Sequence, residues 1–124
     1  MPPPWPWTPH IKYVHAMLRR MRAAVRQIDD AVHERWQQVN AGTIPPGRAT
    51  PELAAEADLS DYTVKHIELL YNLAKAISTM VNKSILMGPL GPLDHLYIRR
   101  ELRKMVKTLE ESADDILESL GRSR

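Results

Sequence analysis

Three long segments of this 124-residue chain place apolar side chains three and four residues apart, and this spacing constrains the fold most. In the first segment, nine apolar residues recur at these intervals between Ile11 and Val39. An α-helix turns once every 3.6 residues, so these residues form one stripe on a helix of about 30 residues. No segment alternates apolar and polar residues with a period of two, as a half-buried strand does. The chain is therefore predicted to be all-α.

Turn and capping residues divide the chain into four helices. Thr8-Pro9 and Thr50-Pro51 are typical helix starts, Ser60 can cap another, and Gly88-Pro89 and Gly121 are helix ends. These signals predict a helical bundle with three long helices over about 9–40, 61–86 and 93–120, and one short helix over about 51–58. Residues 9–121 are predicted to form a single domain, between a Pro/Trp-rich tail at 1–8 and a frayed tail at 122–124.

Several classes of protein are disfavoured by composition. The chain has no Cys, which excludes disulfides, thiolate metal sites and thiol nucleophiles. The first residues lack the features of a signal peptide, and no apolar run approaches the roughly 18 residues of a membrane span. The five His residues share no ligand spacing, and no catalytic constellation is visible. We therefore expect a cytoplasmic, non-enzymatic protein without a cofactor, metal or membrane partner.

Charge is distributed in blocks, although the formal net charge is only +2. Residues 1–28 and 95–109 carry net charges of +5 and +4, whereas residues 52–68 and 110–118 carry −4 and −5. Such blocks suggest oriented docking on a charged partner or on a second copy of the chain. Alternatively, the basic and acidic blocks pair with each other within the bundle.

Two basic clusters are the most site-like feature of the sequence. They comprise Lys12, Arg19, Arg20, Arg22 and Arg26 on the first helix, and Arg99, Arg100, Arg103, Lys104 and Lys107 on the last. On a helical wheel most of each cluster forms a ridge beside the apolar stripe, and the two ridges line one groove if their helices are suitably placed. Arginine donates paired hydrogen bonds to phosphate, so these ten residues are predicted to contact a nucleic-acid backbone.

Residues 50–67, TPELAAEADLSDYTVKHI, resemble a helix-turn-helix. Asp58 stands where that family usually has Gly in the turn. The resemblance implies a regulator that reads DNA with its second helix, through Tyr62, Thr63 and Lys65.

Other residues are candidates for protein contacts. Trp5 and Trp7 lie on the proline-rich tail, where a large aromatic side chain either folds back or anchors a partner. Leu69, Leu73 and Met80 widen the apolar arc of the 61–86 helix, which predicts a central helix or a contact with another subunit.

Three functional hypotheses follow. The first is an accessory subunit that contacts a nucleic-acid backbone within a larger nucleoprotein assembly, as small helical subunits of RNA-guided complexes do. The second is a helix-turn-helix regulator that uses residues 50–67. The third is a protein-interaction bundle, such as a self-assembling or inhibitory protein, with no role in nucleic-acid binding.

Overall fold

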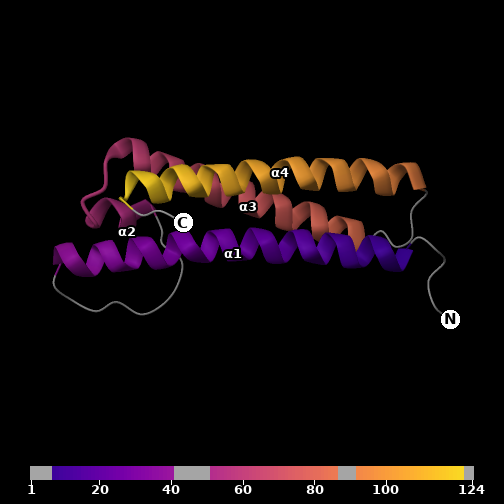
Figure 1. Ribbon diagram of the computed structural model, residues 1–124, viewed down its shortest axis with the longest axis horizontal. Coiled ribbons are helices and arrows are strands. Elements are labelled where there is room, and N and C mark those ends of the chain that lie inside the picture. The colour runs from indigo at the N-terminus through magenta and orange to yellow at the C-terminus, as the bar shows by residue number, and fades with distance from the viewer. Residues whose placement is uncertain (1–6, 41–50, 87–91, 122–124) are drawn as a thin grey trace.

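The computed structural model describes residues 7–40, 51–86 and 92–121 and confirms an all-α helical bundle (Figure 1). Its elements are α1 (Trp7–Asn40), α2 (Pro51–Glu56), α3 (Asp61–Leu86) and α4 (Pro92–Ser119). The long helices agree with the predicted ranges to within two residues. Because α1 begins at Trp7, the last two residues of the predicted tail belong to this helix. Trp5, the rest of that tail and the predicted frayed end lie outside the described residues.

The long helices alternate in direction, so α1 and α4 run parallel to each other and α3 runs antiparallel to both (Figure 1). Tyr13 and Arg20 of α1 contact Arg99 and Glu110 of α4, in the same order along both helices. In contrast, His10 near the start of α1 contacts a residue near the end of α3, since its Nε2 lies 2.7 Å from Ser84 Oγ. The short helix α2 lies at the end of the bundle where α1 finishes.

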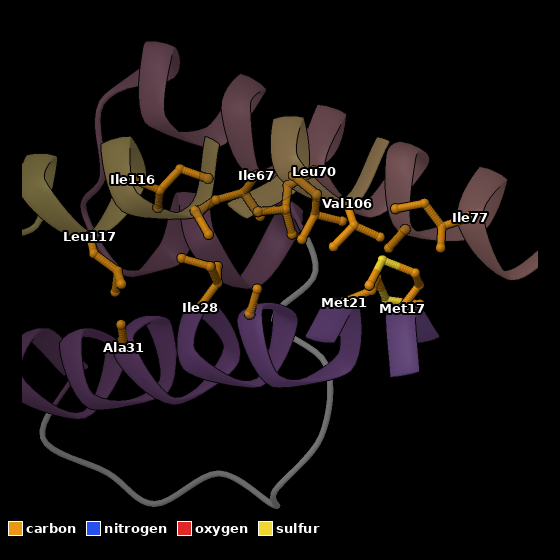
Figure 2. Packing of buried hydrophobic residues seen from close by; sticks show 14 of the residues in the cluster. Met17, Met21, Ile28, Ala31, Ile67, Leu70, Ile77, Val106, Ile116 and Leu117 are labelled. Carbon is orange, nitrogen blue, oxygen red and sulfur yellow. The ribbon is translucent and has the colours of Figure 1, made fainter. Parts of the chain in front are cut away.

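A single hydrophobic core runs between the three long helices, each of which packs on the other two. Figure 2 shows Met17 and Met21 of α1 near Ile77 of α3 at one end, and Ala31 of α1 opposite Leu117 of α4 at the other. The apolar stripes predicted from the sequence supply nearly all of these side chains. Its fully buried members include large side chains such as Ile28, Leu70 and Leu109 as well as Ala54 and Ala113.

Polar contacts fix the short helix and the turn that follows it. Asn40 Nδ2 donates to the Glu56 carbonyl at 2.9 Å, and Trp36 Nε1 donates to the Glu56 carboxylate at 3.2 Å. The turn then passes through Asp58, whose φ of 58° is left-handed. Ser60 caps α3 as predicted, because its Oγ accepts the Thr63 N–H at 3.2 Å.

Candidate functional site

The helix directions gather charge of one sign at each end of the bundle. We define the basic half as residues 7–26, 69–86 and 92–109, which contribute net charges of +5, +2 and +3. The acidic half comprises residues 27–40, 51–68 and 110–121, which contribute −2, −4 and −5. The described residues therefore carry +10 in one half and −11 in the other, because α1 and α4 start at the same end and α3 finishes there (Figure 1).

Most of the predicted nucleic-acid contacts are accessible in the basic half. Arg99 is half-buried, and the other nine residues of the two basic clusters are exposed. Between described residues, only two of the ten form ion pairs: Arg20 with Glu110, and Lys104 with Glu101 at 3.9 Å. The alternative in which the basic and acidic blocks pair with each other therefore holds for Arg20, since Lys104 pairs with Glu101 of its own block.

Arg20 differs from the other arginines because it joins two helices. Its Nε donates to Glu110 Oε2 at 3.2 Å, and its Nη2 donates to Glu110 Oε1. The hydrogen bonds to this carboxylate raise the pKa of Arg20. We therefore assign Arg20 mainly to the α1–α4 contact rather than to a ligand site.

Part of the basic cluster of α1 lies beside α3. Arg22 and Arg26 line a cavity of about 590 Å³ together with Lys75 from α3. Met21, Val25 and Ala74 supply its apolar lining. Its remaining polar groups are Asp29, Tyr71, Asn72 and Ser78.

The ridge of α4 lies on the opposite flank of α1. Arg99, Arg100 and Arg103 line a second cavity of about 330 Å³ with Tyr13 and Leu96. The guanidinium carbon of Arg99 lies 5.3 Å from the centre of the Tyr13 ring, and the Tyr13 hydroxyl donates to the Arg99 carbonyl at 3.4 Å. This cation–π contact fixes Arg99 against α1.

The two ridges thus line two separate cavities. Although α1 and α4 are neighbours, the two cavities have no described lining residue in common. The helical wheel places each ridge beside an apolar stripe correctly, but it does not say which neighbouring helix occupies which side. The outer surface of α1, which carries Lys12 and Arg19, separates the two cavities.

The helix-turn-helix region lies in the acidic half. Tyr62 is exposed and its ring lies 4.0 Å from that of His66, while Thr63 is buried and bonded to Ser60 and Ser119. Thr63 is therefore unavailable to read a base edge, in contrast to the expectation from the resemblance. Lys65 is the only cation in residues 51–68, where five acidic side chains oppose phosphate contact.

The residues predicted to contact proteins are placed differently from one another. Leu69 is 58% exposed, whereas Leu73 and Met80 are half-buried and pack against the core. Trp7 starts α1, and its side chain is outside the described part. Of the three α3 residues predicted to contact a partner, Leu69 alone thus has an exposed side chain.

Sequence reasoning missed a pair of buried histidines. The rings of His10 and His95 stack with centroids 4.1 Å apart and an interplanar angle of 5°. Burial, followed by the charges of His95 and Arg99, lowers the pKa of His10 to about 4, and burial also lowers the pKa of His95. A search for ligand spacing could not find this pair. The available signal was helical phase, since His10 lies one turn before buried Val14 on the apolar stripe.

Two further findings concern metal binding and membrane-spanning helices. Within the described residues, no three His, Asp or Glu side chains converge closely enough to hold a metal ion. None of the described helices combines the length and the hydropathy needed to cross a membrane.

Comparison of the chain with protein-family models, curated proteins and solved structures gave no match.

Proposed function

We propose that this protein is a non-enzymatic helical subunit that contacts a nucleic-acid backbone through its basic half, within a larger nucleoprotein assembly in the cytoplasm. The observation that carries the proposal is the segregation of charge. Eight of the ten predicted contact residues lie in the basic half without an ion-pair partner among the described residues. Uncompensated cations on one face attract a polyanion, and phosphates of a nucleic acid repeat along its length.

The geometry favours contact with the backbone over reading of bases. The exposed cations are spread over the outer surface of α1 and the two cavities beside it, so they can follow a chain of phosphates. The most plausible base-reading segment, residues 60–67, lies in the acidic half. We therefore rank the accessory subunit above the helix-turn-helix regulator.

The acidic half supports a role within an assembly. Its net charge of −11 repels nucleic acid, so it orients the bundle with its basic half toward the backbone. The same half offers a complementary surface to a basic neighbour, either another protein or the basic half of a second copy. A protein-interaction bundle with no nucleic-acid role is the alternative that this half favours. An absorbance ratio of 260 to 280 nm, together with the mass of the purified complex, separates the two.

A filter-binding series across salt concentrations tests the proposal, with single- and double-stranded DNA and RNA as probes. The logarithm of the affinity should fall linearly with the logarithm of salt, with a slope of about −0.7 to −0.9 per phosphate contact. The triple variant R19E/R22E/R103E should abolish binding. The control R35E/K65E reverses two exposed cations of the acidic half and should bind nearly as the parent does. An unchanged affinity of the triple variant, or an affinity insensitive to salt, would contradict the proposal.

A further inference from the structure

The cavity between α1 and α3 has features that the contact with a backbone does not require. Three cationic side chains from two helices, Arg22, Arg26 and Lys75, surround one volume of about 590 Å³. This volume falls within the range of roughly 300–1,000 Å³ found for small-molecule sites. None of the three forms an ion pair with a described carboxylate. The cations therefore converge on a space large enough for a small ligand.

The charge of the cavity indicates which anion it suits. Asp29 also lines the cavity, so the four charged side chains carry a net charge of +2. A phosphodiester in a nucleic-acid backbone carries one negative charge, whereas a phosphate monoester carries about −1.5 to −2 at pH 7. Arginine holds phosphate oxygens through paired N–H donors, and lysine adds a mobile point charge. A terminal or free phosphate monoester matches this site better than an internal phosphate does.

The uncharged lining indicates what the phosphate is attached to. Val25 and the ring of Tyr71 are half-buried and present apolar surface to the cavity, whereas Met21 and Ala74 are buried. An aromatic ligand ring can stack on the ring of Tyr71. Asn72 and Ser78 line the same cavity and can exchange hydrogen bonds with hydroxyl groups. A ligand that carries a flat apolar ring and a hydroxylated linker beside its phosphate uses all of these groups.

We propose that this cavity binds a nucleoside monophosphate unit, with its phosphate monoester held by Arg22, Arg26 and Lys75. The unit has two possible sources, a free mononucleotide or the 5′-phosphorylated end of a strand. The inference goes beyond the proposed function, because a backbone of diesters needs no such cavity. The site can also be tested separately from the proposed function, because Lys75 lies on α3 outside the two predicted ridges.

Isothermal titration calorimetry with adenosine 5′-monophosphate tests the site. We expect binding that is at least about tenfold tighter than that of adenosine, because adenosine lacks the charge-assisted hydrogen bonds. Succinate serves as a control with the same charge but no ring, and should bind more weakly than the nucleotide. The variant K75Q should weaken nucleotide binding at least about tenfold. Its matched control is K83Q, which removes another exposed lysine of α3 in the basic half and should change binding less than twofold.

Paired oligonucleotides that differ only in a 5′-phosphate or a 5′-hydroxyl identify the source. Tighter binding of the phosphorylated strand, lost in K75Q, supports the strand end. Equal binding of the two strands, together with nucleotide binding that K75Q weakens, supports the free mononucleotide. The proposal is overturned if the nucleotide binds no better than adenosine or succinate, or if K83Q loses as much affinity as K75Q. A third outcome is strand binding that depends on salt and is unaffected by K75Q, in the absence of nucleotide binding. This outcome would support the proposed function and reject this site alone.

Discussion

Arg20 of α1 and Glu110 of α4 form a two-point ion pair where the basic half meets the acidic half. The pair forms because α1 and α4 run in the same direction, so the end of the basic stretch of α1 lies beside the start of the acidic stretch of α4. It is one of only two ion pairs between described residues that involve the basic clusters. Of these two pairs, only Arg20–Glu110 joins the two halves, because Lys104 and Glu101 both belong to the basic half.

This pair should contribute little to stability in spite of its geometry. Arg20 is 46% exposed, so solvent and salt screen the interaction. A double-mutant cycle with R20A and E110A should give a coupling free energy of about 0.2–1 kcal/mol. Urea unfolding at low and high salt measures it, and the coupling should shrink at high salt. A coupling above about 2 kcal/mol that persists at high salt would show that the pair is effectively buried.

The buried histidine pair should make the fold sensitive to acid. The pKa of His10 falls from 6.5 to about 4 on folding, so the unfolded chain binds more protons between these pH values. The contribution of His10 to the free energy of unfolding is therefore fully present above pH 6.5 and is lost as the pH falls toward 4. The loss for this residue is about 3 kcal/mol. The variant H10Q should lose less stability than the parent between pH 7.5 and 4.5 in urea unfolding. Identical losses in the two proteins would contradict the assigned pKa.

Two adjacent leucines of α3 provide a test of the packing. Leu70 is 1% exposed in the core, and Leu69 is 58% exposed. L70A should lower the free energy of unfolding by about 2–5 kcal/mol, because it removes buried methyl groups and leaves a cavity. L69A should change it by less than about 0.5 kcal/mol. Chemical denaturation of both variants measures the difference. Equal effects would mean that a different face of α3 packs on the core.

Replacement of Asp58 by glycine should stabilise the turn between α2 and α3. The φ of 58° at Asp58 is strained for a residue with a Cβ atom, although Asp tolerates it better than most. D58G should raise the free energy of unfolding by up to about 1 kcal/mol, whereas D58A should lower it. Thermal unfolding of the two variants checks the sign of each change. Destabilisation by D58G would mean that the Asp58 side chain stabilises the turn.

Helices and their boundaries followed from local information, because helical periodicity and capping act over a few residues. Val14, Met21, Ile28 and Val32 of the predicted stripe are buried in α1, whereas Val39 at its end is 45% exposed. Ser60 caps α3 as its sequence position predicts. The charge blocks are equally visible in the sequence. Where the charge blocks lie in the folded bundle depends on the direction of each helix. Because α2 spans only six residues at one end, α3 is the second long helix and α4 the third, which makes α4 parallel to α1.

The sequence by itself determined a helical bundle with alternating blocks of charge, since both properties are written in residue order. The tertiary structure alone decided that like charges share one half and that Arg22 and Arg26 lie beside α3. An apolar stripe packs equally well with its two neighbours in either order, so periodicity cannot specify which flank each neighbour takes. The packed helices make that choice, and it brings Arg22 and Arg26 of α1 beside Lys75 of α3 around one cavity.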